Sequence, residues 1–211
     1  MVQARLIAKP AKRSRVRRFW IGILLLPAVP ALALAANPHL FYAMTNLLGV
    51  TGCGGTASNS RNASTTLKTI VAAQYDYHDN DRDGNLRKDF WRGDIAGLYT
   101  QHYDSDPAKD PMKLIELSTA SADDRPVSDL TPYAIRSAKA GYWYRALLHE
   151  DEETASPDRF AVVAFPDTPS VSKWMFIVDE ENYVYRKKTE GQRGIDRYPK
   201  DPLKAGWEKL D

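Results

Sequence analysis

The feature of the sequence that most constrains the fold is a series of four strand-like segments in its second half. Each segment is rich in aromatic and β-branched residues, which favour β-strands, and a turn-forming stretch separates it from the next. The segments cover residues 141–149, 159–166, 173–179 and 183–188. Because the links between them are short, consecutive strands are expected to pair as an antiparallel meander. Arg145, Arg186 and Lys187 alternate with apolar neighbours, so one face of this sheet is predicted to face solvent.

The segments before the predicted sheet have helical character. Ser64 or Thr65 can cap a helix, and the apolar residues that follow recur at helical spacing, which predicts a helix over 65–77. Shorter helices are expected over 112–120 and at the C-terminal end over 201–211, while 90–101 is either a short helix or a packed loop. Helices that precede strands are typical of an α+β fold, here with helices packed on a four-stranded antiparallel meander.

The N-terminal part of the chain has the pattern of a targeting segment. Residues 1–18 contain seven Lys and Arg and no acid, and residues 19–36 contain no charge at all. A basic segment before an apolar one places the N-terminus in the cytoplasm, and 18 apolar residues are just enough to span a bilayer. We therefore expect four parts, which are a basic cytoplasmic tail (1–18), a transmembrane anchor or signal segment (19–36), a juxtamembrane stretch and flexible tether (37–64) and an extracytoplasmic α+β domain (65–211).

Two other fates of the N-terminus compete with an intact anchor. Ala33, Leu34 and Ala35 form a site of the kind at which signal peptides are cleaved. Cys53 follows a glycine and precedes a small polar stretch, as in a bacterial lipoprotein signal, which makes it a candidate for lipidation. All three fates place the rest of the chain outside the cytoplasm. With the anchor intact, the protein is expected to cross a bacterial inner membrane once, with its C-terminal domain extracytoplasmic.

Charge and cysteine content exclude several classes of function. Removing the seven basic residues of the tail from 29 leaves 22 Lys and Arg against 27 Asp and Glu, a formal balance of about −5. The basic character therefore belongs to the tail, and a nucleic-acid partner is not expected. Cys53 is the only cysteine, which excludes an intrachain disulfide and a thiolate zinc site.

An Asp-rich stretch between the predicted helices resembles the start of a calcium-binding loop. Its order, D-x-D-x-D-G, supplies the first oxygen ligands and the sharp turn of an EF-hand loop. Phe90 stands where such a loop has its bidentate Glu, so Ca²⁺ would need Asp89 or Asp94 to complete a non-standard site. The alternative is a polar turn that joins two elements. The candidate ligands are Asp79, Asp81, Asp83, Asn85 and Asp89.

The organisation of the chain resembles that of the pilin-like proteins of bacterial secretion systems, which have a basic tail, an apolar N-terminal segment, a helix, a loop and an antiparallel sheet. Four motifs are also similar to those of an uncharacterised set of exported planctomycete proteins. The resemblance implies an exported, membrane-attached domain with a pilin-like fold and brings no established activity with it. The prepilin cleavage signature is missing, since Arg18 precedes Phe19 and no Glu follows. The motifs are NDRDGNLRKDFWRGDIAGLY (80–99), KAGYWYRAL (139–147), FAVVAFP (160–166) and FIVDEENYVYRK (176–187).

The sequence favours a non-enzymatic exported protein that is held at the membrane through residues 19–36, with other envelope or secretion proteins as its partners. A second hypothesis is a binding module in which Trp143 and Trp174, on an exposed aromatic sheet face, recognise a carbohydrate or an envelope protein. A third is a hydrolase, which would need His102 or His149 beside an acid and a nucleophile in a concave pocket. No G-x-S-x-G, P-loop or H-E-x-x-H motif occurs. The acidic pairs at 123–124 and 152–153 are interpreted as solvated charges in turns.

Overall fold

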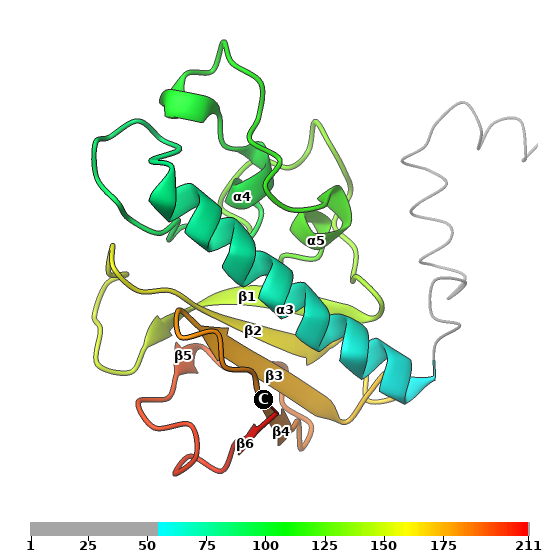
Figure 1. The fold of residues 1–211 in the computed structure, drawn as a ribbon. Coiled ribbons are helices and arrows are strands. Elements are labelled where there is room, and N and C mark those ends of the chain that lie inside the picture. Colours follow the sequence, from blue (N-terminus) through cyan, green and yellow to red (C-terminus); the bar gives the residue numbers. More distant parts are fainter. Residues whose placement is uncertain (1–54, 211) are drawn as a thin grey trace, which may run out of the picture. The chain divides into compact units, whose positions relative to one another are not determined.

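The computed structural model describes residues 55–210, and Figure 1 shows how their helices and strands are arranged. The basic tail, the predicted anchor at 19–36, the lipidation candidate Cys53 and residues 37–54 of the predicted juxtamembrane stretch and tether lie outside the described residues. No helix within residues 55–210 combines the length and the apolar composition needed to cross a bilayer. The helical elements are α3 (Thr56–Asp79), α4 (Gly97–Thr100), the 3-10 turn η2 (Tyr103–Ser105) and α5 (Leu117–Ser121). The strands are β1 (Tyr142–His149), β2 (Ala161–Pro166), β3 (Trp174–Asp179), β4 (Tyr185–Lys188), β5 (Arg197–Tyr198) and β6 (Glu208–Lys209).

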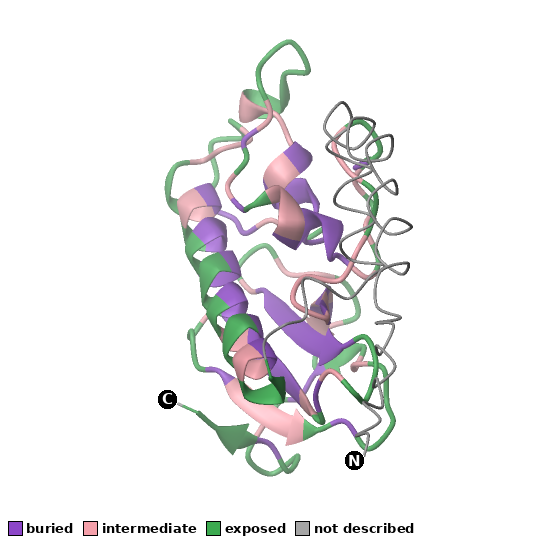
Figure 2. Ribbon diagram, turned by 90° about the vertical axis from the view of Figure 1, so that its right-hand side faces the viewer, coloured by how far each residue is buried: buried purple, intermediate pink, exposed green. Residues whose placement is uncertain are grey.

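Helix α3 is the only long helix of the described part, and it begins at Thr56, well before the predicted start at residue 65. Its first turns therefore come from residues that were expected to belong to the tether. Their small polar side chains are poor helix formers, but Asn59 and Ala63 are buried against the rest of the domain, and this burial outweighs weak propensity. Figure 2 shows the helix with one buried side and one exposed side, as expected for an amphipathic helix that covers a sheet.

The predicted fold class is wrong, because the sheet has six strands and is mixed. The strand order is β5-β1-β2-β3-β4-β6. The pairs from β1 to β4 and the pair β4–β6 are antiparallel, but β5 pairs with β1 in parallel through two residues. The fold is therefore not a four-stranded antiparallel meander covered by several helices, since α3 is the one helix within residues 55–210 that is longer than five residues.

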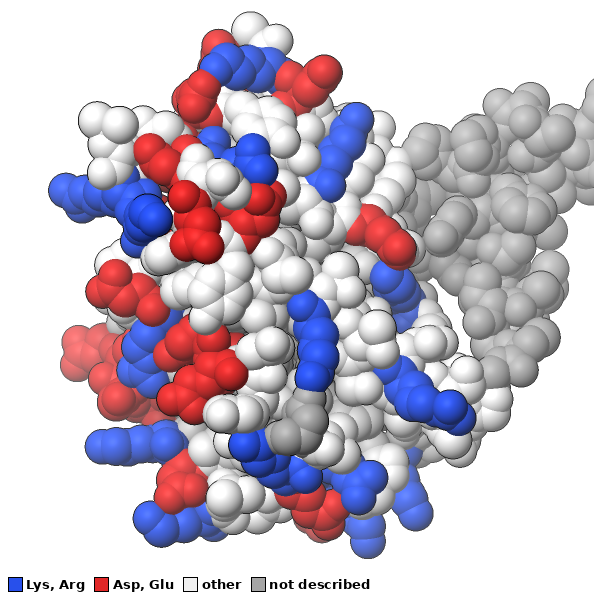
Figure 3. All heavy atoms as spheres, in the orientation of Figure 1, with Lys and Arg blue, Asp and Glu red and all other residues white. Residues whose placement is uncertain are grey.

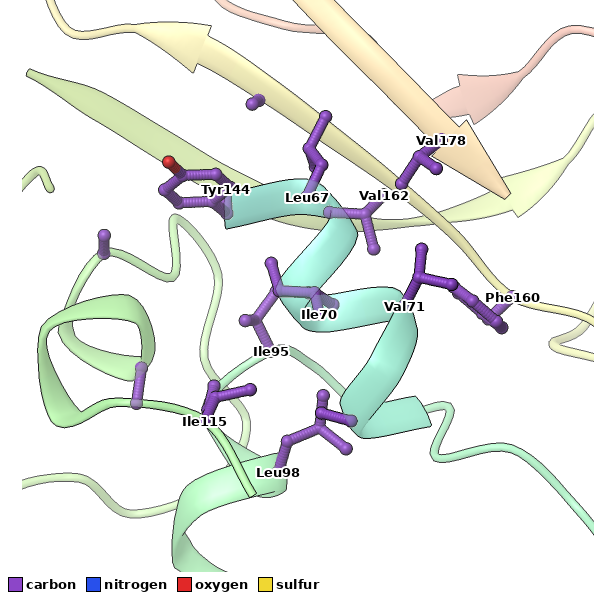
Figure 4. Close-up of a cluster of buried hydrophobic side chains, with 14 of the residues drawn as sticks. Leu67, Ile70, Val71, Ile95, Leu98, Ile115, Tyr144, Phe160, Val162 and Val178 are labelled. Atoms are coloured by element: carbon purple, nitrogen blue, oxygen red, sulfur yellow. The ribbon is translucent and has the colours of Figure 1, made fainter. Parts of the chain in front are cut away.

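Both faces of the sheet are covered, so the prediction of a solvent-facing sheet surface is also wrong. The first core lies between α3, the segment around α4 and α5, and one face of the sheet, and Figure 4 shows Leu67 and Ile70 of α3 among side chains from β1, β2 and β3. The second core lies on the opposite face, where Tyr198 and Trp207 of the C-terminal segment pack over Val163 and Ile177. All six residues of β2 are buried as a result. Each fully buried aliphatic side chain contributes roughly 1.5–3 kcal/mol to folding.

The C-terminal segment covers the second face without the helix that was predicted over 201–211. Residues 201–206 form turns, and Gly206 has a positive φ of 82° that ends any helical path there. Trp207 is buried, whereas Leu203 is exposed, so the two do not form a helical pair. The two residues of β6 then pair with the outer edge of β4.

Two buried carboxylates hold the loops beside α3 in place. Asp123 accepts hydrogen bonds from the backbone N–H groups of Ile95 and Ala96 at 2.7 and 2.9 Å. Asp94 accepts backbone hydrogen bonds from Gly97 and, across the chain, from residues 127 and 128. The interpretation of the acidic pair at 123–124 as solvated charge is therefore wrong, because Asp123 is only 1% exposed.

Candidate functional site

A cleft of about 610 Å³ lies between the first turns of α3 and the strands β3 and β4. Its volume is within the usual range of small-molecule sites. The face of the molecule drawn in Figure 3 has basic side chains where α3 begins, at lower right, whereas acidic side chains gather on the left, toward the other end of the helix. The cleft belongs to the basic end, because Thr56 and Ala57, the first two residues of α3, line it.

The charged side chains that line the cleft within residues 55–210 are all cationic, namely Arg61, Lys173 and Arg186. Within the described residues, neither Arg61 nor Lys173 forms an ion pair with a carboxylate. Arg186 donates from Nε to Glu208 at 2.9 Å and lies over the ring of Trp174, with its Cζ atom 4.6 Å from the ring centroid. The Lys173 Nζ atom is 5.8 Å from the same centroid. The cleft is therefore positively charged, and two of its cations gather around one aromatic ring.

A hydroxyl network forms the wall of the cleft and ties α3 to the sheet. The Oγ atoms of Ser60 and Ser172 are 3.1 Å apart, and Ser60 also contacts the hydroxyl of Tyr142. Tyr142 donates to the carbonyl of Trp174 at 3.0 Å, and the Trp174 N–H donates to Ser172. Burial raises the pKa of Tyr142, which keeps its phenol neutral and able to donate. The network fixes Trp174 relative to the helix, so the cleft is largely pre-formed.

The structure separates the two tryptophans that were predicted to form one binding strip. Trp174 is half-buried, lines the cleft and packs on the core beneath α3. Trp143 packs on the opposite face of the sheet, where its Nε1 atom donates to Asp167 at 2.7 Å and Arg136 lies over its ring. Because Trp174 packs against the core on one face of the sheet and Trp143 against the core on the other, the pair does not present a shared aromatic surface.

The predicted calcium ligands are only partly brought together. Asp83, Asn85 and Asp89 line one cavity of about 320 Å³ at the far end of α3. Asp79 instead contacts His78 Nδ1 at 2.8 Å, and Asp81 accepts the N–H of residue 86 through Oδ2 at 3.0 Å. The five side chains thus do not form one oxygen cage. Within residues 55–210, no group of three or more His, Cys, Asp or Glu side chains is arranged to hold a metal ion.

Contacts within the chain order this Asp loop. The side-chain amide of Asn85 donates to Asp83 at 2.8 Å and to Asp89 at 3.3 Å. Burial, together with the nearby Asp83 carboxylate, raises the pKa of Tyr77 above its ordinary value, so the phenol beside the cavity stays protonated. One oxygen, Asp81 Oδ1, is buried without a hydrogen-bond partner in the described part of the chain. The loop therefore resembles a polar turn that retains one unused acceptor.

His102 and His149 do not form the arrangement that the hydrolase hypothesis would need. His102 contacts the carbonyl of residue 109 in an exposed loop. His149 is 2% exposed and lies between Arg159, whose Nη2 is 2.6 Å from Nδ1, and Glu180, whose Oε2 is 3.5 Å from Nε2. Because a guanidinium only donates, Nδ1 accepts and the proton of a neutral His149 is on Nε2. Neither histidine lines the cleft or the cavity of the Asp loop.

Sequence reasoning identified Trp174 but missed the cations that surround it in the cleft. Arg61 lies in a stretch that has the composition of a tether, and Arg186 was expected on a solvent-facing strand surface. No local signal links these two residues, because they are far apart in the chain and meet only when α3 packs across the sheet.

The comparisons with known proteins found no relative of the chain. No family model matches the chain, and no curated protein or solved structure is significantly similar to it.

Proposed function

We propose that the protein is a non-enzymatic exported protein, held in a bacterial inner membrane by residues 19–36, whose extracytoplasmic domain binds an anionic envelope ligand in the cleft beside Trp174. The sequence supports the location through the basic segment that precedes the uncharged one. The buried state of His149 and its contact with Arg159 argue only against a hydrolase that would use this histidine. The proposed partners are components of the membrane or of the envelope, and no nucleic-acid partner is proposed.

The observation that carries the proposal is the charge of the cleft. Among the described residues, three cations line it and no acid does, although Asp and Glu outnumber Lys and Arg in the chain beyond the basic tail. A cleft lined by one sign of charge concentrates ligands of the opposite sign and steers their approach. A neutral or cationic ligand would gain no electrostatic attraction from these three cations.

The test is amine footprinting of the full chain in detergent micelles, with poly-L-glutamate as the anionic probe. We expect the probe to protect Lys173 from acylation several-fold more than Lys88, an exposed lysine at the opposite end of α3. The basic tail binds the same probe, but a residue-resolved readout separates the two sites. Arg61→Gln is expected to reduce the protection of Lys173 by about threefold, since an exposed cation contributes roughly 0.5–1 kcal/mol.

Two results would contradict the proposal. One is equal protection of Lys88 and Lys173, and the other is no protection of either residue. Arg87→Gln is the matched control, because Arg87 is an exposed arginine of the Asp loop whose removal changes the net charge by the same amount. This variant should leave the protection of Lys173 unchanged.

A calcium ion in the Asp loop is a second proposal, favoured by the cavity that Asp83, Asn85 and Asp89 line together. Hard oxygen ligands of this kind suit Ca²⁺. We expect millimolar Ca²⁺, but not Mg²⁺, to raise the melting temperature of the full chain, and Asp81→Ala with Asp83→Ala to remove that gain. A gain that survives the double substitution would place the ion elsewhere, and no gain in the unaltered chain would leave the loop as a polar turn.

A further inference from the structure

The residues of the cleft also indicate the chemical class of its ligand. Resting on the proposed function, we infer that the cleft binds an acidic saccharide, in which a sugar ring carries the carboxylate that the cations recognise. Three features of the lining lead to this class, namely its aromatic rings, its hydroxyl groups and the way in which Arg186 is held.

The aromatic rings supply a surface for the apolar side of a sugar. Trp174 and Phe176 both line the cleft, but Phe176 is only 3% exposed, so the half-buried Trp174 is the aromatic residue that a sugar can contact. Aromatic rings contribute large contact areas at low entropy cost, whereas a simple anion such as phosphate or a polyphosphate chain has no apolar face to place on them. An anion alone would leave this part of the cleft unused.

The hydroxyl groups of the cleft match those of a saccharide. Thr56, Ser60, Ser64 and Ser172 all line it, and each hydroxyl can accept as well as donate a hydrogen bond. Ser60 and Ser64 donate to backbone carbonyls of α3, at 2.9 and 3.0 Å. Ser172 then donates to Ser60, whereas the lone pairs of Ser64 are available as acceptors. Acceptors of this kind are satisfied by sugar hydroxyls and repel a fully ionised phosphate, which carries no proton to donate.

Arg186 is pre-oriented for a carboxylate. Its Nε–H is bound to Glu208 and its Cζ atom lies over the Trp174 ring, 4.6 Å from the centroid, and these two contacts restrict the orientation of the guanidinium. Its Nη groups can then meet a carboxylate in the planar geometry that arginine favours. A sugar that packs near Trp174 brings its carboxylate within reach of Arg186 and Lys173 together.

An extended acidic peptide fits this place less well. Peptides that bind at a sheet commonly add a strand to a free edge. At the β4 side of the sheet, β6 already pairs with Tyr185 and Arg186, so the main-chain groups that would hold such a peptide are engaged.

The experiment uses the full chain in detergent micelles and compares four probes through the protection of Lys173. The probes are tetragalacturonate, the same tetrasaccharide with its carboxylates reduced to alcohols, poly-L-glutamate, and vesicles of phosphatidylglycerol. We expect tetragalacturonate to protect at concentrations at least tenfold lower than the reduced sugar. Trp174→Leu is expected to weaken protection by tetragalacturonate about tenfold while changing protection by poly-L-glutamate less than twofold.

A second variant keeps the inference testable if Trp174→Leu unfolds the domain. Arg186→Lys retains the charge but removes the planar fork, and it should weaken protection by tetragalacturonate about fivefold without lowering the melting temperature by more than a few degrees. Protection by poly-L-glutamate or by the vesicles, with none by tetragalacturonate, would overturn the saccharide while leaving the anionic cleft intact. Protection by none of the probes would overturn the proposed function itself.

Discussion

At the scale of single residues, the domain depends on polar side chains that the chain buries. Asp123 is the clearest case, since burial raises its pKa to about 6 although three backbone N–H groups donate to it and lower that value. A buried carboxylate without such donors would be far more costly. Asp123 therefore joins the loop before α4 to the segment beside β1, and it makes the stability of that junction depend on pH.

Replacing Asp123 with Asn tests this dependence. An amide nitrogen cannot accept, so one buried N–H group loses its partner and unfolding is expected to become easier by about 1–3 kcal/mol at pH 7. The pKa of Asp123 is higher in the folded than in the unfolded chain, where it is 3.8. The folded state therefore takes up a proton first, and this group adds stability as the pH falls from about 6 to 4. The deficit of the variant should grow over that range in urea unfolding curves.

The exposed Asp110 provides the control, because Asp110→Asn should change the free energy of unfolding by less than about 0.5 kcal/mol at any of these pH values. A deficit of Asp123→Asn that shrinks on acidification would mean that the backbone donors, and not burial, govern the charge state of Asp123.

At the scale of elements, the sequence predicted the helices and strands that have a strong hydrophobic pattern. It did not predict elements whose structure depends on contacts between distant segments of the chain. The segments that form β1 to β4 were located to within two residues at each end, because long apolar runs between turns identify strands. The strands β5 and β6 have two residues each and no pattern of their own. They exist because the C-terminal segment packs over the second face of the sheet, and this packing is also why the predicted terminal helix is absent.

Gly194 lies where this C-terminal segment closely approaches the sheet, and replacing it tests that contact. Its φ is 74°, and a Cβ atom there would lie 2.7 Å from Cδ1 of Phe165 in β2. Gly194→Ala is therefore expected to cost about 2–4 kcal/mol, from backbone strain together with displacement of the covering segment. Thermal unfolding of the full chain measures the loss.

Gly191 offers a matched control in the same segment. Its φ is 85°, but a Cβ atom there would meet nothing within 4 Å. Gly191→Ala should therefore cost only the backbone strain, about 1 kcal/mol. Equal losses for the two variants would show that contact with Phe165 does not hold the C-terminal segment on the sheet.

At the scale of the whole molecule, the fate of the N-terminal segment determines which ligands the cleft can reach. Thr56 lines the cleft, and Cys53 lies only three residues before it, outside the described residues. If residues 19–36 are an intact anchor, we expect the cleft to stay attached to the membrane and to meet components of the envelope. Cleavage after Ala35 would release the same cleft from the membrane, and lipidation at Cys53 would attach it through a much shorter link.

Intact mass and cysteine labelling together distinguish these fates. For an anchored chain we expect the unprocessed mass of 23.7 kDa in isolated membranes, together with labelling of Cys53 by a membrane-impermeant maleimide added to spheroplasts. Cys53→Ser removes the only cysteine and provides the blank for the labelling. Loss of the first 35 residues would indicate cleavage, and an unlabelled chain with the added mass of lipid would indicate a lipoprotein. Labelling that appears only after lysis would place Cys53 in the cytoplasm, and a cleft exposed there could not meet an envelope saccharide at all.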